Sequence, residues 1–205
     1  MRYLELIADS DKTPESKKES ERGAIASLFM EFGKVAQETV NMIQAEWGEE
    51  NFSTEETSSE NEMSIVQYAN LCEKKILLTG DAGRGALTEA SEYAPNVNLY
   101  LPGIDRFQVP HHGSRRNLSS ELLDTWLGEK LPERPNEGTE YFTGIVSASE
   151  KDEDHPRNVV RRAIKHRGGE VYTNEEASLR SGFNAPARAG WSSANPLPYP
   201  EKQEE

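Results

Sequence analysis

The stretch Leu77-Leu78-Thr79-Gly80-Asp81 decides the fold, together with Val109-Pro110-His111-His112-Gly113-Ser114 about thirty residues later. In each stretch, apolar strand residues lead into a turn that carries groups able to bind a metal ion or a phosphate. A glycine in each turn lets the backbone bend closely. Either stretch alone is more often a plain turn or a packed histidine. Their occurrence together, in this order, indicates two strand ends that share one function.

The residues around these stretches alternate between strand and helix patterns. We expect strands at residues 64–68, 75–78, 107–109, 141–146 and 170–172. We expect helices at residues 85–93, from the capping serines 119–120 to 127, and from Pro156 to the glycines at 168–169. Strands alternating with helices predict an α/β (α+β) fold.

Composition divides the chain into three regions. Residues 1–61 are acidic and include a long amphipathic helix expected at residues 24–47, where apolar residues recur at steps of three and four. Residues 62–185 hold the strand and helix patterns. Residues 186–205 are rich in Pro, Ser and Glu and predict a flexible tail, just as the acidic residues 48–62 predict an exposed loop.

Charge and cysteine content limit the kind of protein. The net charge is −13, and residues 1–62 contribute 15 acidic and 6 basic side chains to it. This balance argues against broad attraction to nucleic acid or to an anionic membrane, but it leaves room for a local basic site. One cysteine, Cys72, permits no internal disulfide, and no apolar run is long enough to span a bilayer. We expect a cytoplasmic protein with no membrane contact.

A third segment, Asp154-His155-Pro156, precedes the helix expected at Pro156. His155 alone is more often an ordinary loop residue than a ligand. Basic residues lie close to both histidine segments. Arg115 and Arg116 follow Ser114 directly, and the helix after His155 carries Arg157, Arg161, Arg162, Lys165 and Arg167. These side chains could form a solvated surface, or they could clamp a phosphate with the planar guanidinium groups.

The order of these motifs resembles a known family. The motifs LLTGD, VPHHGS, HP at a helix start and GGEVY follow one another as in metallo-β-lactamase-fold hydrolases, and the similarity is closest to the hydrolase domain of ComEC-type DNA-uptake (competence) proteins. The strand residues Asn61–Val66 resemble an upstream strand of that family. The resemblance covers about residues 61–173. It implies half of an αββα sandwich, preceded here by the long amphipathic helix.

The resemblance also implies a chemistry. Members of the family usually hold two zinc or manganese ions, which activate a hydroxide for hydrolysis, often of a phosphodiester. Asp81 is similar to the metal-bridging aspartate, and His111 or His112 to a metal ligand or a catalytic histidine. The resemblance implies that His155 lines the same cleft, and we expect substrate contacts for His155 and for the neighbouring Ser114, Arg115 and Arg116. The implied substrate is a nucleic acid or a nucleotide.

One departure from the family is decisive. The main ligand motif, His-x-His-x-Asp-His, should precede Asp81, but no histidine occurs before His111. Asp81 and one histidine are too few donors, because a zinc site needs about three or four protein ligands. Two hypotheses follow. The chain is an incomplete or split hydrolase, completed by an N-terminal half or a partner bound through helix 24–47. Alternatively, it is a non-catalytic interaction or regulatory subunit that keeps the half-fold.

Overall fold

The computed structural model describes residues 46–136, 138–149, 151–152, 154–175 and 178–203. At its centre is one sheet with the strand order β1-β2-β3-β4-β5. The strands are β1 (Gln67–Leu71), β2 (Lys74–Leu78), β3 (Arg106–Gln108), β4 (Phe142–Val146) and β5 (Gly169–Thr173). The helix expected at residues 24–47 lies outside the described residues, except for its last two positions.

The first two strands form a tight antiparallel hairpin. Its turn residues, Cys72 and Glu73, both have left-handed backbone angles, with φ of 53° and 63°. This is the conformation that two-residue hairpin turns require, and Asn-Gly or Asp-Gly usually provides it. Because Cys-Glu gives no such signal, the sequence placed the first strand three residues too early, at 64–68 instead of 67–71.

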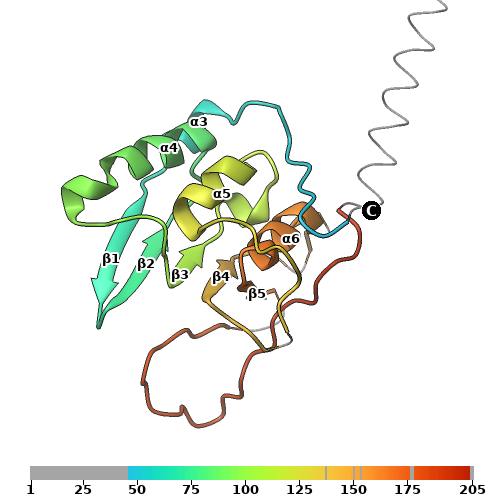
Figure 1. Cartoon of the computed structure of the whole chain (residues 1–205). Coiled ribbons are helices and arrows are strands. Elements are labelled where there is room, and N and C mark those ends of the chain that lie inside the picture. The colour runs from blue at the N-terminus through green and yellow to red at the C-terminus, as the bar shows by residue number, and fades with distance from the viewer. Residues whose placement is uncertain (1–45, 137, 150, 153, 176–177, 204–205) are drawn as a thin grey trace, which may run out of the picture. The chain divides into compact units, whose positions relative to one another are not determined.

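The remaining strands run parallel and are joined by helices. β2, β3, β4 and β5 pair in chain order. The connections contain α4 (Arg84–Tyr93) and the 3-10 helix η1 (Ala94–Val97), then α5 (Ser120–Leu127), then α6 (Asn158–His166). Right-handed crossovers that advance in one direction place their helices on one face, and Figure 1 shows α4, α5 and α6 along the same side of the sheet. The α/β expectation is confirmed.

The core lies between the sheet and these helices. Leu77, Phe107 and Val171 occupy one row across the sheet and are buried. The fourth member of the row is Gly144, where an added Cβ would lie 3.1 Å from Ile164 of α6. The absence of a side chain therefore lets α6 pack directly on β4. Ser119 caps α5 as expected, because its side chain accepts a hydrogen bond from the Leu122 N–H.

The opposite face of the sheet carries no helix among the described residues. Over β3–β5, residues 179–182 and 193–194 of the C-terminal segment line a cavity of about 270 Å³ together with side chains of the sheet. Arg106 donates to the Ser181 hydroxyl at 2.7 Å, and its guanidinium lies 4.3 Å from the centre of the Phe183 ring. Over β1 and β2 the same face exposes Leu71 and Leu78. This face of the sheet is thus in contact with the C-terminal segment in one half and exposes apolar side chains in the other.

Two segments expected to be loose are packed in the structure. The described residues between 46 and 203 form one compact unit. Glu50, expected in an exposed loop, has a fully buried side chain. Gln203, expected in a flexible tail, is also buried. Glu50 is held by hydrogen bonds at the end of α6, described below, and the Gln203 side chain accepts a hydrogen bond from the Asn51 N–H. Every helix in the described ranges is too short or too polar to cross a membrane.

Candidate functional site

The carboxyl ends of two neighbouring parallel strands bring the predicted residues together. Asp81 follows β2, and His111 and His112 follow β3 in a short 3-10 turn, η2 (His111–Gly113). The His111 N–H donates to the Gly80 carbonyl at 3.1 Å, which joins the two turns directly. In sheets of this kind, ligands bind outside the carboxyl ends of the strands. The topology therefore places all three residues where a site is expected.

Hydrogen bonds hold the turn after β2 in place. The Thr79 hydroxyl donates to the Gln108 carbonyl at 2.8 Å, and the Gln108 side chain accepts from the Thr79 and Gly80 N–H groups at 3.1 and 3.3 Å. On the other side, the Asn117 amide donates to the Asp81 carbonyl at 3.0 Å. The backbone that carries the Asp81 carboxylate is therefore fixed from two directions.

Asp81 and His111 meet as expected. His111 Nδ1 lies 3.6 Å from Asp81 Oδ1, which is too long for a hydrogen bond. Among the described residues, this buried nitrogen has no hydrogen-bond partner. Two donors on one tetrahedral zinc ion would be about 3.3 Å apart. The pair therefore has the spacing of two ligands that share an ion, and it includes an unsatisfied nitrogen.

The backbone of the two histidines is unusual. His111 and His112 have φ values of 45° and 57°, in the left-handed region that non-glycine residues rarely adopt. Two successive residues of this kind store strain, and such strain clusters at functional sites. His112 turns away from the pair: its Nδ1 contacts the Ser147 carbonyl after β4. A ligand would therefore meet the Nε2 atom of His112.

His155 lies beside the same cluster. Its ring is 6.4 Å from that of His111, and its Nδ1 contacts both carboxylate oxygens of Asp152 at 3.1 and 3.2 Å. The hydrogen bond from His155 holds the pKa of Asp152 below its usual value. The residue after His112 is Gly113, which lets Pro156 pack closely against this turn. An added Cβ on Gly113 would lie only 2.6 Å from Pro156 Cβ. The carboxylate thus orients the ring and directs Nε2 away from Asp152.

The predicted substrate-binding residues differ in what they contact. Ser114 is buried, and its hydroxyl accepts from the Arg116 N–H at 3.3 Å. The Arg116 guanidinium forms an ion pair with Glu55, and the Arg157 guanidinium forms one with Asp154 at 3.3 Å. Arg115 also has a partner. A phosphate would therefore have to compete with these partners for the arginines. The roles predicted for Ser114, Arg115 and Arg116 stay predictions.

The helix after His155 is not a solvated basic surface along its whole length. Arg162 and Arg167 are buried. Arg162 donates to the carbonyls of Glu46 and Pro200 at 2.6 and 2.9 Å. Arg162 and His166 lie on the same helical face as Val159 and Ala163, so the sequence spacing could have revealed their burial. Arg162 and Arg167 therefore belong to the interior and not to a phosphate clamp.

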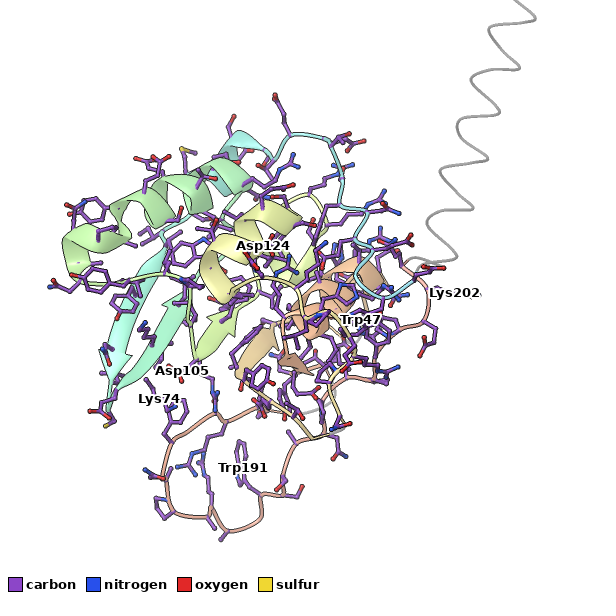
Figure 2. The ribbon with its side chains drawn as sticks, viewed as in Figure 1. Trp47, Lys74, Asp105, Asp124, Trp191 and Lys202 are labelled. Carbon is purple, nitrogen blue, oxygen red and sulfur yellow. The ribbon has the colours of Figure 1, made fainter. Side chains whose placement is uncertain are left out.

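A buried polar cluster, which the sequence did not indicate, lies beneath these residues. Glu50 accepts from Arg167 at 2.8 Å, from His166 Nδ1 at 2.7 Å and from the Ser120 hydroxyl at 2.6 Å. Burial alone would raise the pKa of Glu50, but the hydrogen bonds from His166 and Arg167 lower it to about 2. Figure 2 shows two neighbours of this cluster: Asp124 on α5, which pairs with Arg167, and Trp47, whose ring packs against His166.

The donors present do not complete a metal centre. Within the ranges that the structure describes, no group of three or more His, Cys, Asp or Glu side chains could hold a metal ion. Asp81 and His111 provide two donors, whereas zinc takes about four. The described residues therefore do not by themselves fit a one-metal or a two-metal site. The cluster is also open, with the side chains of His111 and Asp81 38% and 51% exposed.

A cavity elsewhere in the molecule does not include this cluster. Its volume is about 520 Å³, and it lies between α4 and residues 62–66. Enclosed apolar pockets are the usual sites for small ligands, but this cavity contains none of the residues singled out above. Its glutamates, Glu62, Glu89 and Glu92, make it acidic. We therefore base the candidate site on the chemistry of the histidine cluster and not on cavity size.

Comparison with known proteins identifies no relative. No protein-family model, no curated protein and no solved structure matches the chain. The resemblance to metallo-β-lactamase-fold hydrolases therefore stays a prediction from the motifs.

Proposed function

We propose that the chain supplies part of the active site of a metal-dependent hydrolase of the metallo-β-lactamase fold, acting on phosphodiesters in a nucleic acid or nucleotide. In this proposal the missing metal ligands come from further sequence of the same protein or from another chain. The observation that carries it is the approach of His111 Nδ1 to Asp81 Oδ1, with the nitrogen otherwise unsatisfied. An unpartnered buried polar atom is costly and calls for a ligand.

Each residue of the cluster has a separate part in the proposal. Asp81 and His111 would be two of the residues that hold the metal, together with the donors supplied from elsewhere. His155, oriented by Asp152, would present Nε2 towards the substrate, where this nitrogen can form a hydrogen bond to a phosphate oxygen. His112 is a second candidate for contact with a scissile phosphate. When bound, the metal would lower the pKa of water and polarise the phosphoryl group.

The half-sandwich belongs to the same proposal. Helices cover one face of the sheet, and the other face exposes Leu71 and Leu78 over β1 and β2. A sheet that is apolar on its second face normally buries that face against another layer. The site also lies open at the sheet edge, as it would if the second layer contributed one of its walls. These features support an incomplete sandwich that a second sheet would complete.

The experiment combines metal binding with hydrolysis. Zinc or manganese is titrated into the full chain by calorimetry, and turnover of a chromogenic phosphodiester is measured on the same samples. We expect weak metal binding, weakened at least about tenfold further by Asp81→Ala, which corresponds to about 1.4 kcal/mol. The chain alone should cleave no faster than Asp81→Ala. The matched control is Asp154→Ala, which removes a nearby exposed carboxylate and should leave metal binding unchanged.

Two outcomes would contradict the proposal in different ways. Equal metal affinity for the wild type and Asp81→Ala would show that Asp81 is not a ligand, and the hydrolase proposal would fail. Tight stoichiometric metal with Asp81-dependent turnover would instead show that the chain completes its own site. A His-x-His-x-Asp-His motif in adjacent coding sequence would favour the enzyme hypothesis, and co-expression of that segment should then restore tight metal binding.

One observation favours the alternative, a non-catalytic interaction subunit. The C-terminal segment already contacts this face of the sheet at Arg106 of β3 through Ser181 and Phe183, where a second sheet would pack. A segment that stays bound to this face of the sheet prevents a complete second sheet from packing there. The same titration separates the two readings, because an interaction subunit should bind metal no better than Asp81→Ala.

A further inference from the structure

The cavity of about 270 Å³ between the sheet and the C-terminal segment contains no residue of the histidine cluster. Figure 1 shows the chain after β5 as a wide loop that returns to the sheet. Successive side chains of a strand point to opposite faces, so the residues next to the core positions Phe107, Gly144 and Val171 face this loop. Those that line the cavity are Arg106, Thr143, Ile145 and Tyr172.

Arg106 brings a positive charge to the cavity and attaches the loop to the sheet. Its Nε donates to the Ser181 hydroxyl at 2.7 Å, and its Nη1 donates to the Asp105 carbonyl at 2.9 Å. The guanidinium also lies 4.3 Å from the centre of the Phe183 ring. Neither hydrogen bond uses Nη2, whose two N–H groups can donate to a ligand. Arg180 lines the same cavity, and its Nη1 donates to the Pro186 carbonyl at 3.3 Å.

Glu140 brings a negative charge to the same cavity. Its carboxylate accepts from the Thr143 hydroxyl and from the Tyr172 hydroxyl, the latter at 3.4 Å. An ionised carboxylate has about four acceptor positions, so Glu140 can accept further hydrogen bonds. Among the described residues, neither Arg106 nor Arg180 forms an ion pair with Glu140. The cavity therefore holds charges of both signs that do not neutralise each other directly.

A ligand with both charges fits such a cavity better than a simple anion or cation. An anion would be repelled by Glu140, and a cation would be repelled by the two arginines. The size also limits the ligand. A water molecule in the liquid takes up about 30 Å³, so the cavity has room for about nine groups of that size, close to the number of non-hydrogen atoms in leucine.

We propose that this cavity binds a free α-amino acid with an apolar side chain. The carboxylate of the amino acid pairs with Arg106 and Arg180, because a guanidinium matches a carboxylate in shape and charge. Its ammonium group donates to Glu140. Its side chain packs against Ile145 of the sheet and Leu179 of the loop, which are the larger apolar residues of the lining. The proposal does not depend on the hydrolase function.

The test is calorimetric titration of the full chain with L-leucine. We expect saturable binding of one leucine per chain. Two analogues probe the charges separately: 4-methylpentanoate is leucine without the ammonium group, and 3-methylbutylamine is leucine without the carboxylate. Each should bind at least about tenfold more weakly than leucine, because one ion pair is lost and a like charge remains in the cavity.

Variants of the cavity make the test specific to the two ends of the ligand. Glu140→Gln should weaken leucine binding by about tenfold but should not weaken binding of 4-methylpentanoate, which has no ammonium group. Arg180→Gln should weaken leucine and leave 3-methylbutylamine no weaker. Arg188→Gln is the matched control, because Arg188 lies in the same loop but stacks on Trp191 at 4.8 Å and does not line this cavity. Circular dichroism checks that each variant folds.

Several outcomes would overturn the proposal. One is the absence of saturable heat up to about 10 mM leucine, which corresponds to an affinity too weak for a specific site. Another is an analogue that binds as tightly as leucine. Glu140→Gln that weakens leucine and 4-methylpentanoate equally would show that Glu140 only supports the local structure. Equal losses for Arg188→Gln and Arg180→Gln would show that the effect comes from the charge of the loop and not from this cavity.

Discussion

The side chains of His166 and Glu50 are fully buried, whereas those of His111 and Asp81 are largely open to solvent. Both pairs join a histidine to a carboxylate. In the buried pair, arginine, serine and a backbone N–H satisfy the remaining polar atoms. In the exposed pair, His111 Nδ1 lacks a hydrogen-bond partner among the described residues. The difference indicates that the first pair holds the chain together and that the second is available to a ligand.

The buried cluster connects segments that are distant in the sequence. His166 Nδ1 contacts Glu50, and its Nε2 accepts from the Gly48 N–H at 3.3 Å and lies 3.1 Å from the Tyr199 hydroxyl. Residues 46–50 and 197–203 are therefore both attached to α6. Each attachment depends on buried polar groups, which are costly unless every partner is present.

The largest effect is expected for Arg167→Ala. The substitution removes the cation that pairs with Glu50 and Asp124 and leaves the Glu50 carboxylate buried without its main partner. Breaking a buried ion pair in this way typically costs about 3–5 kcal/mol. Urea unfolding of the variant would measure the loss. The control, Arg116→Ala, removes a surface ion pair with Glu55 and should cost less than about 1 kcal/mol. Similar losses of unfolding free energy for both variants would show that the buried ion pair stabilises the fold no more than the surface ion pair does.

The next effect is a loss of stability in acid. Glu50 stays ionised in the folded chain down to about pH 2, but its ordinary pKa is 4.5. As the pH falls from 4.5 towards 2, the unfolded chain takes up a proton that the folded chain does not, which costs about 3 kcal/mol. Burial also lowers the pKa of His166, despite the opposing hydrogen bond to Glu50, so the decline begins below pH 6.5.

Urea midpoints measured between pH 7 and pH 3 would test this dependence. The wild-type chain should lose stability steadily below pH 6.5. Glu50→Gln should start from a lower stability but lose less over the same range, because its side chain no longer titrates. A wild-type profile that is flat or rises towards low pH would show that the buried cluster does not control acid stability.

The sequence predicted local features better than long-range ones. The strand ends carrying Asp81 and His111 were recognisable because apolar strand residues precede a turn with polar groups. Their convergence followed from the parallel α/β arrangement. Glu50 was not recognisable, because an acidic residue in a polar segment has no local sign of burial. Its partners His166 and Arg167, at the C-terminal end of α6, lie more than one hundred residues away, so only the tertiary structure reveals these contacts. The packing of Tyr199 and Gln203 was missed for the same reason.

The smallest effect on stability should come from Asp81→Ala. Asp81 is half exposed, and its side chain approaches His111 only at 3.6 Å, beyond hydrogen-bond distance. Removing an exposed carboxylate with so little bonding should change the free energy of unfolding by no more than about 0.5 kcal/mol. Urea unfolding of Asp81→Ala and of Arg167→Ala under the same conditions would compare the free energy of unfolding that each carboxylate site contributes. A loss of 2 kcal/mol or more would show that Asp81 stabilises the fold. Its position at the sheet edge would then need no ligand to explain it, and the hydrolase proposal would lose its main support.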